Sequence, residues 1–281
     1  DAVLNQFERA QEWADLIRYL QQLQRTLTKH SAIPIIPDKV LVASIMEEYD
    51  KDAWVEITER VQETGVHGFE LNFSCPHGHP EKGMGAAMGQ DPERVETVTR
   101  WVVEDAGGKP VWSKMTPNIT DITQPAAAAR RGGAQGVSAI NTILACIGVN
   151  LKTLRPQPTV EGHSTYGGYS YLAVKPIALR MVAEIARAHP GFSISGIGGV
   201  TCAADAIEHM LVGANTVQSC TGPMLQGFGM VEELIEGTEA FMEQHGFETR
   251  NPCKWLQVGD FRSVAVQAKF RAFSCLQYKA T

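Results

Sequence analysis

The chain has 281 residues, of which 44% are apolar and 20% are charged, and its formal net charge is −6. This apolar content is enough for one large hydrophobic core or two small ones. The acidic balance and the lack of a basic run argue against nucleic acid as a partner. No run of about 18 uninterrupted apolar residues is present, so we expect no membrane span.

The six cysteines are widely spaced, and none forms a C-x-x-C pair. This spacing gives little support to zinc or iron–sulfur ligation, so we expect no metal site and free thiols in a reducing compartment. Residue 1 is Asp rather than Met, which is consistent with a missing targeting segment or N-terminal portion.

Strand-like and helix-like patterns alternate along the chain after a first predicted helix. The apolar run at 39–45 is typical of a strand buried on both faces, and helical periodicity follows until Gly65 ends it. The predicted strands are 39–45, 68–72, 110–115, 136–140, 192–197 and 214–219, with a long loop after the fourth. The predicted helices are 5–27, 52–64, 92–105, 121–131, 174–189, 202–212 and 230–244, and 257–276 is a weaker candidate.

Six strand–helix units in succession predict an α/β fold with a parallel sheet, either doubly wound or closed into a barrel. We favour a (β/α)8 TIM barrel that lacks its first two strands in this chain, because the segment before residue 39 has a helical pattern. We expect residues 1–250 to form this N-terminally incomplete barrel and residues 251–281 to be a C-terminal extension. In such a barrel the active-site groups lie where the strands end.

The second predicted strand ends in the densest group of reactive side chains. Asn72 is followed by Ser74, Cys75 and His77 in a glycine-flanked loop. A free Cys is commonly a buried, inert thiol, but at a strand's carboxyl end it can act as a general acid or a nucleophile if a neighbour tunes its pKa. His77 alone favours neither role.

Other strands end in different polar groups. Lys114 ends an apolar strand, where its ammonium needs an anion or an electron-rich ring unless it reaches solvent. Asn118 either caps the following helix or contacts a ligand. Asn141 and Thr142 follow the fourth strand. If the amides of Asn72 and Asn141 face each other across a barrel mouth, they suit a planar ring with alternating C=O and N–H groups; the alternative is turn formation.

Glycine-containing turns follow the last two strands. Gly198 and Gly199 precede one helix, and Cys220 and Thr221 follow the next strand. Backbone N–H groups in such turns bind phosphate, and barrels often carry a phosphate site after their last two strands; tight turns alone are the alternative. The long loop between the fourth and fifth strands is typical of a lid or binding loop, or is a surface irregularity.

Together these motifs resemble the flavin domain of dihydropyrimidine dehydrogenases, within the wider dihydroorotate dehydrogenase-like barrel family. The likeness runs from about residue 4 to residue 247, and its middle part is most similar to the single-domain form of plants and algae. The motifs, in the family's order, are NFSCPHG, GMGAAMGQDP, KMTPNITDITQPA, SAINT, LKTLRPQPTVEG, VKPIALRMV and SGIGGV.

The resemblance implies roles for individual residues. Cys75 matches the family's mobile-loop general acid. The residues matched to the pyrimidine site are Asn5, Asn72, Asn141 and Thr142, with Ser74 and His77 in the active-site loop. The residues matched to the FMN site are Lys114 near the ring, and Gly168, Gly198, Gly199, Cys220 and Thr221 around the ribityl chain and phosphate.

The sequence also departs from the family pattern. The two opening strands and the flavin-contacting lysine they carry are missing. After Asn5, Phe7 stands where the family has an acidic contact, and Glu8 follows. Tyr171 replaces a usual glycine. The iron–sulfur and FAD modules of larger relatives are absent as well.

The resemblance implies an oxidoreductase that acts on CH–CH groups in pyrimidine catabolism. The expected reaction is FMN-dependent reduction of the 5,6 double bond of uracil or thymine with electrons from NADPH, directly or through a partner, since no nicotinamide motif is visible. The alternatives are dihydroorotate oxidation with Cys75 as base, and an inactive barrel that serves as a structural or accessory subunit. We expect a homodimer or an electron-transfer partner, and a plastid or cytoplasmic location.

Overall fold

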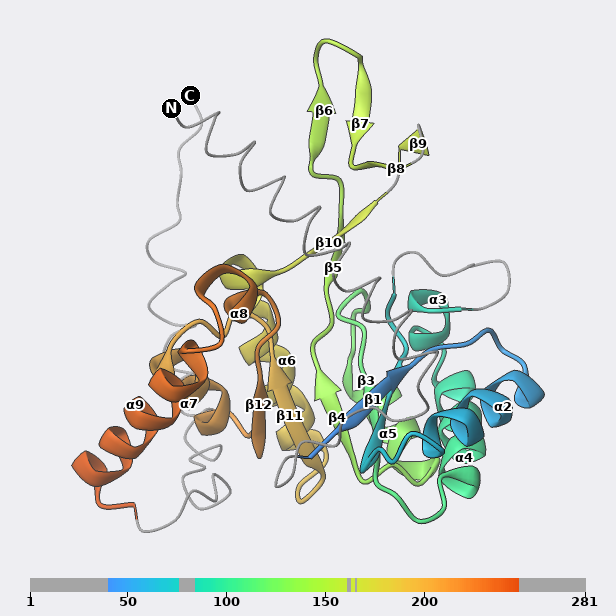
Figure 1. The fold of residues 1–281 in the computed structure, drawn as a ribbon, viewed down its shortest axis with the longest axis horizontal. Helices are drawn as coiled ribbons and strands as arrows, with labels where there is room; N and C mark the ends of the chain where they lie inside the picture. Colours follow the sequence, from blue (N-terminus) through green and yellow to red (C-terminus); the bar gives the residue numbers. More distant parts are fainter. Residues whose placement is uncertain (1–39, 76–83, 161–162, 165, 248–281) are drawn as a thin grey trace, which may run out of the picture.

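The computed structural model describes residues 40–75, 84–160, 163–164 and 166–247 (Figure 1). Their largest element is a six-stranded parallel sheet with the order β1-β2-β3-β4-β11-β12. All six predicted strands are confirmed, and the fold is the predicted α/β barrel type with six strands present. The sheet strands are β1 (Val42–Ile45), β2 (Gly68–Asn72), β3 (Val111–Lys114), β4 (Gly136–Ala139), β11 (Ser193–Ile197) and β12 (Thr216–Gln218).

The sheet is rolled rather than flat. Gln218 at the end of β12 donates from Nε2 to Oε2 of Glu70 in β2 over 3.0 Å, although three strands separate β2 from β12 in the sheet. Within the described residues, β1 and β12 are the two edges of the sheet. The six strands therefore form an open barrel whose inner face brings distant strands into contact.

The two faces of β2 differ in polarity, and this difference explains which face of the rolled sheet lies inside the barrel. Phe69 and Leu71 are fully buried and belong to the hydrophobic core, which continues into the helices. Glu70 lies between them in the sequence and lines the interior of the barrel. Successive side chains of a strand point to opposite faces, so one face of β2 is apolar and packs under helices while the other is polar.

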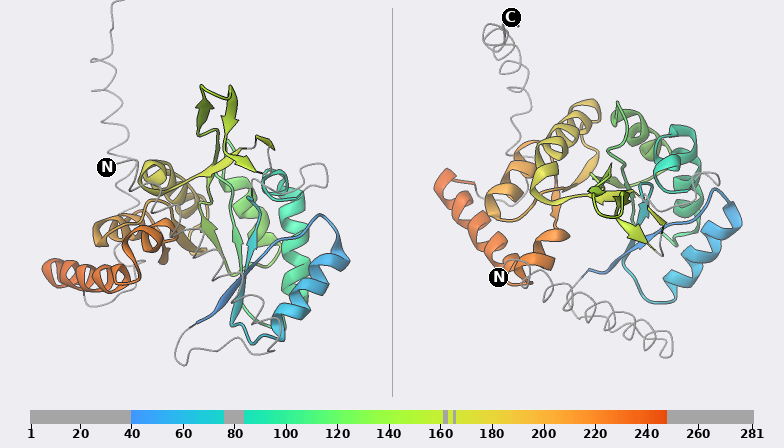
Figure 2. Two further views of the ribbon diagram at one scale, coloured as in Figure 1. Left: turned by 45° about the horizontal axis from the view of Figure 1, so that its top comes forward. Right: turned by 90° about the horizontal axis from the view of Figure 1, so that it is seen from above.

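Helices cover the outer face of the sheet, and Figure 2 shows them from above in an arc around the strands. Two of these helices start at an aspartate that caps the helix: Asp50 accepts the N–H of Ala53 at the start of α2, and Asp91 accepts those of Glu93 and Arg94 at the start of α4. The helices are α2 (Lys51–Gln62), α3 (Ala86–Gly89), α4 (Pro92–Asp105), α5 (Thr123–Arg131), α6 (Lys175–Ala188), α7 (Ala203–Leu211), α8 (Thr221–Gln226) and α9 (Met230–His245), and a 3-10 turn, η2 (Tyr171–Val174), precedes α6.

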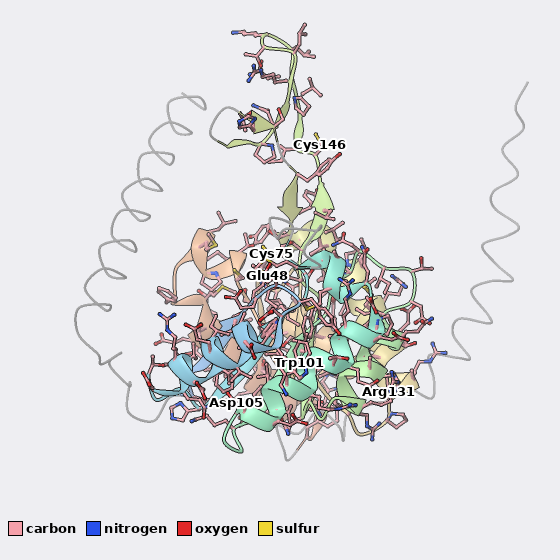
Figure 3. The ribbon with its side chains drawn as sticks, turned by 90° about the vertical axis from the view of Figure 1, so that its right-hand side faces the viewer. Glu48, Cys75, Trp101, Asp105, Arg131 and Cys146 are labelled. Carbon is pink, nitrogen blue, oxygen red and sulfur yellow. The ribbon has the colours of Figure 1, made fainter. Side chains whose placement is uncertain are left out.

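The prediction of a long loop after β4 is wrong, because this segment forms short antiparallel strand pairs that together make an arm. Figure 3 shows the arm projecting from one end of the barrel. The sequence did not reveal these strands because each has only two or three residues, too few for a periodic pattern. The pairs are β5 (Ile143–Ala145) with β10 (Gly167–Tyr169), β6 (Gly148–Asn150) with β7 (Arg155–Gln157), and β8 (Thr159–Val160) with β9 (His163–Ser164).

Several expectations fall outside the described residues. They are the predicted helices at 5–27 and 257–276, the C-terminal extension 251–281, and the site residues Asn5 and His77. Among the helices that the structure does describe, none is long and apolar enough to cross a bilayer.

Candidate active site

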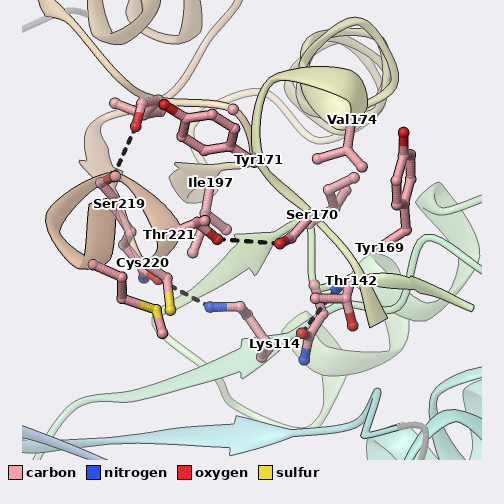
Figure 4. Close-up of a pocket in the computed structure, with 18 residues that line it drawn as sticks. Lys114, Thr142, Tyr169, Ser170, Tyr171, Val174, Ile197, Ser219, Cys220 and Thr221 are labelled. Atoms are coloured by element: carbon pink, nitrogen blue, oxygen red, sulfur yellow. Dashed lines mark hydrogen bonds between the residues drawn. The ribbon is translucent and has the colours of Figure 1, made fainter. Parts of the chain in front are cut away.

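A cavity of about 410 Å³ lies at the carboxyl ends of β3, β4, β11 and β12 (Figure 4). Parallel strands bring their carboxyl ends to one edge, which is where barrel enzymes carry their sites. Segments from β3 to α8 contribute to the cavity, so residues more than 100 positions apart meet there. The predicted site residues that line it are Lys114, Asn141, Thr142, Gly198, Gly199, Cys220 and Thr221.

The two predicted amides do face each other. Nδ2 of Asn141 donates to Oδ1 of Asn72 over 3.0 Å, and this bond joins the ends of β4 and β2 across β3. Backbone donors fix both amide orientations, because Oδ1 of Asn72 also accepts the N–H of Ser74 and Oδ1 of Asn141 accepts the N–H of Thr142. Nδ2 of Asn72 has no acceptor among the described residues. The pair therefore leaves amino N–H groups, which are hydrogen-bond donors, without a partner in the described residues.

Lys114 points into the barrel and meets an anion, as its strand-end position predicts. Its Nζ lies 3.2 Å from Oε1 of Glu70 and 2.9 Å from Oε1 of Gln218. The other carboxylate oxygen of Glu70 accepts from Ser138 at 2.6 Å and from Gln218 at 3.0 Å. These groups form a polar network directly below the cavity, which Lys114 and Gln218 also line.

The network keeps Glu70 ionised. Burial raises the pKa of this carboxyl, but the Lys114 ammonium and the hydrogen bonds from Ser138, Gln218 and Lys114 outweigh it and leave the pKa below its ordinary value. Sequence reasoning missed Glu70 and Gln218. The available signal was a carboxylate in the middle of an apolar strand, since such a group needs a buried cation.

The Gly198–Gly199 turn forms another part of the wall. Both glycines have positive φ, +128° and +75°, and a Cβ on Gly199 would lie 2.5 Å from Cβ of Lys175 in α6. Only glycine fits both the conformation and the space. Within the described part of the chain, the N–H groups of Gly199 and Val200 have no acceptor. Free backbone donors in a glycine turn are suited to an anion.

The base of the arm contacts the start of α8. Ser170 and Thr221 share a hydrogen bond of 3.1 Å between their hydroxyls. Gly168 is not a lining residue, but a Cβ there would overlap Oγ1 of Thr142, so its role is to let β10 approach the end of β4. Tyr171, which stands where the family has glycine, has a φ of +70° and lines the cavity.

Cys75 lies three residues after Asn72 and is half-buried with a free thiol. Cys75 does not line the cavity. The fully buried Ser74 precedes it and donates its backbone N–H to Asn72, which links Cys75 to the amide pair. The carbonyl of Cys75 accepts the N–H of Ala86 over 3.2 Å. Figure 3 shows Cys75 at the end of the barrel from which the arm projects.

Of the two alternatives for Asn118, capping of the following helix is excluded, since the N-cap of α5 is Ile122. Oδ1 of Asn118 accepts the N–H of Leu144 over 2.9 Å, and its Nδ2 donates to Oγ1 of Thr116 and to the carbonyl of Thr142. The N–H of Thr123 at the start of α5 is accepted by the carboxylate of Asp121. Asn118 therefore holds the start of the arm beside the cavity.

Comparison with known proteins gives the family. The family model described as dihydroorotate dehydrogenase matches residues 13–242. This chain belongs to the dihydroorotate dehydrogenase family. Members of this family are flavin enzymes.

Three relatives in this family show where the chain is most similar. It is 53% identical over 218 residues to the chloroplastic dihydropyrimidine dehydrogenase (NADP(+)) of Arabidopsis thaliana, covering 76% of this chain and 51% of that protein. It is 44% identical over 216 residues to the NAD-dependent dihydropyrimidine dehydrogenase subunit PreA of Escherichia coli, covering 76% and 52%. It is 42% identical over 193 residues to the dihydroorotate dehydrogenase B (NAD(+)) catalytic subunit of Pyrococcus furiosus, covering 69% and 61%.

Solved structures support the family fold. The ligand-free dihydroorotate dehydrogenase of Eimeria tenella superposes with a TM-score of 0.63 at 19% identity, over 84% of this chain and 68% of that one. At this identity the likeness concerns the fold alone. The chain spans about half the length of the two dihydropyrimidine dehydrogenase relatives.

Proposed function

We propose that this chain is the FMN-binding barrel of an enzyme that reduces the 5,6 double bond of uracil or thymine, with electrons derived from NADPH. The observation that carries the proposal is the Asn72–Asn141 amide pair at the strand ends, beside a cavity that ends in a glycine turn. Identity of 53% to a plant dihydropyrimidine dehydrogenase (NADP(+)) supports the choice of substrate and electron source.

The residues present fit a flavin mononucleotide. The free N–H groups of Gly199 and Val200 and the hydroxyl of Thr221 are donors suited to its phosphate. Lys114, at the base of the cavity, would lie near the ring system, with Glu70 as its fixed counter-ion. When bound, FMN supplies the two-electron redox chemistry that amino-acid side chains lack.

The amide pair would hold the pyrimidine. Uracil carries two ring carbonyls, which are acceptors, and the amino groups of Asn72 and Asn141 are donors whose orientation is set by backbone bonds. Thr142 adds a hydroxyl at the same strand end. Fixing the ring in one orientation lowers the entropic cost of bringing its double bond into reacting position. Ser74 contributes by holding Asn72, with Asn5 and His77 as further proposed contacts.

Cys75 would supply the proton. A thiol near a strand's carboxyl end can protonate C5 of the pyrimidine as a general acid, a role worth about 10²–10⁴-fold in rate. The half-buried thiol and its fixed carbonyl support this assignment. Asn72, three residues before Cys75, ends β2 and accepts the hydrogen bond from Asn141, which lines the cavity.

The test uses the full chain with FMN, NADPH and uracil. Titration with FMN should give the bound flavin's absorbance band, and uracil should be reduced. Cys75→Ala should bind FMN as the unchanged chain does and lose turnover by at least about 100-fold. Cys146→Ala is the matched control, since Cys146 is also free but exposed on the arm. Full uracil turnover by Cys75→Ala would refute the acid role, and a chain that binds no flavin would favour an inactive accessory subunit.

Dihydroorotate oxidation is the second candidate, and the family match together with 42% identity to the Pyrococcus furiosus catalytic subunit favours it. In this reaction Cys75 would act as a base. Dihydroorotate carries a carboxylate that uracil lacks, so the two substrates separate the candidates directly. Turnover of dihydroorotate but not of uracil would replace the first proposal with the second.

Partners and location follow from the same relatives. The Escherichia coli relative is named as a subunit, which supports an electron-transfer partner or a homodimer for this chain. The Arabidopsis relative is named as chloroplastic, which supports a plastid location over the cytoplasm.

A further inference from the structure

The glycine turn of the cavity is held from behind by one face of α7. Asp205 accepts the N–H groups of Thr201 and Cys202 over 2.9 and 3.2 Å. Four residues later, Nε2 of His209 lies 3.1 Å from the carbonyl oxygen of Gly198. Residues four apart share a helix face, so Asp205 and His209 bind the two ends of the segment 198–202.

His209 is completely buried, and its surroundings fix its protonation. The Gly198 carbonyl is only an acceptor, so Nε2 carries the proton. Nδ1 is buried with no partner in the described part of the chain. It lies 2.7 Å from the position that a Cβ on Gly196 would take, so the ring packs directly on the backbone of β11. A second ring proton would have no acceptor there, and burial accordingly lowers the pKa of His209.

We propose that His209 is a positioning residue: its bond to the Gly198 carbonyl keeps the Gly198–Gly199 turn in the conformation that binds the flavin phosphate. This inference rests on the proposed binding of FMN. The carbonyl of Gly198 and the free N–H of Gly199 are linked through one peptide unit, so a donor that holds the carbonyl also sets the direction of the N–H.

The alternative is that His209 only fills space in the core. Filling space would affect the stability of the whole fold and every ligand alike. Holding the turn would affect only the end of the ligand that carries the phosphate. FMN and riboflavin differ by this phosphate, so the ratio of their affinities separates the two roles.

The experiment measures FMN and riboflavin affinity by flavin fluorescence titration of the full chain, with melting temperature recorded for each variant. His209→Leu removes the donor and should weaken FMN binding by about tenfold while riboflavin affinity stays within about twofold. His209→Gln keeps an amide donor of similar reach and should restore most of the FMN affinity. His209→Asn keeps an amide that is too short and should behave like His209→Leu, which covers the case that the leucine variant does not fold.

His189 provides the matched control. Its Nε2 also bonds a backbone carbonyl, that of Thr123 over 2.9 Å, but it does not line the cavity. His189→Leu should leave both flavin affinities unchanged. Equal loss of FMN and riboflavin affinity in the His209 variants, or an unchanged FMN preference, would overturn the inference while leaving flavin binding intact. Failure of the unchanged chain to bind FMN would instead overturn the proposed function on which it rests.

Discussion

Asn141 and Asn72 are joined by a 3.0 Å hydrogen bond although β3 lies between their strands. Asn72 is the last residue of β2 and Asn141 lies two residues beyond the end of β4, so both stand at the same edge of the rolled sheet. Backbone donors hold the acceptor atoms of both amides, so the amino groups are what remains for a ligand.

Asn141→Ala should therefore weaken substrate binding without releasing the flavin. It removes the proposed donor to the pyrimidine and the hydrogen bond that Asn72 accepts from Asn141. We expect KM for uracil to rise by about tenfold to 100-fold, which corresponds to the loss of one well-placed hydrogen bond, and FMN affinity to stay within about twofold. Steady-state kinetics and a flavin titration measure the two quantities. Asn150→Ala is the control, because Asn150 also accepts a backbone N–H, that of Lys152, but on the arm. Equal effects from both variants would contradict a substrate role for Asn141.

Removal of the Glu70 charge should destabilise the barrel. Glu70→Gln keeps the shape of the side chain but leaves the buried ammonium of Lys114, whose side chain is 9% exposed, without a counter-ion. Removing one charge of a buried ion pair lowers the free energy of unfolding by about 3–5 kcal/mol. The hydrogen bonds that remain place this variant near the lower figure. Chemical denaturation measures the free energy of unfolding. Glu96→Gln is the control: Glu96 pairs with Arg131 at 2.7 Å on the surface, and its loss should not change stability measurably.

The same pair gives a pH dependence with a definite sign. The pKa of Glu70 is lower in the folded chain than its ordinary value of 4.5, so its contribution to stability is present above about pH 4.5. That contribution is lost as the pH falls through the folded-state pKa. The unfolding free energy of the unchanged chain should thus drop more steeply below about pH 4.5 than that of Glu70→Gln. Parallel acid limbs for the two proteins would show that Glu70 is not charged in the fold.

The strand ends of this site were predictable from the sequence, whereas the interior of the barrel was not. Asn72, Lys114 and Asn141 follow apolar runs, and parallel strands necessarily bring such ends together. Glu70 pairs with Gln218, 148 residues away, and nothing local in either strand indicates the other. The curvature that brings them together arises from the packing of all six strands.

The arm and the backbone of Tyr171 were missed for related reasons. The arm's strands have two or three residues, and their pairing depends on the partner strand rather than on local propensity. Tyr171 has no intrinsic preference for positive φ, so only the surrounding structure imposes it. The sequence indicated the site of the strain only through the resemblance, which places a glycine there.

Two residues with left-handed backbone allow the strain at Tyr171 to be measured. Leu154 has a φ of +56° in the arm and is 77% exposed, while Tyr171 has a φ of +70° in the cavity wall. Leu154→Gly should gain about 0.5–1 kcal/mol, because the relief of about 1–2 kcal/mol exceeds the added entropy of glycine in the unfolded chain. Its melting temperature should rise by about 2 °C. Tyr171→Gly gains the same relief but loses a half-buried ring, so its melting temperature should fall below that of Leu154→Gly. An equal rise in both would mean that the Tyr171 ring contributes nothing to the cavity wall.

Gly85 packs against the backbone of Cys75, and this close approach allows a test of the role proposed for the Cys75 thiol. A Cβ on Gly85 would overlap the carbonyl oxygen of Cys75, and Gly85 also has a φ of +62°. Gly85→Ala should therefore displace the Cys75 backbone and reduce kcat about 100-fold, the scale expected for a misplacement near 1 Å, with FMN binding unchanged. Gly108→Ala is the matched control, because Gly108 has a φ of +79° but nothing within 4 Å of the added methyl group. Both substitutions place a side chain at a positive φ, but only the methyl group of Gly85→Ala also meets the backbone of Cys75. If kcat falls equally in both, the loss reflects strain in the fold rather than the position of the thiol.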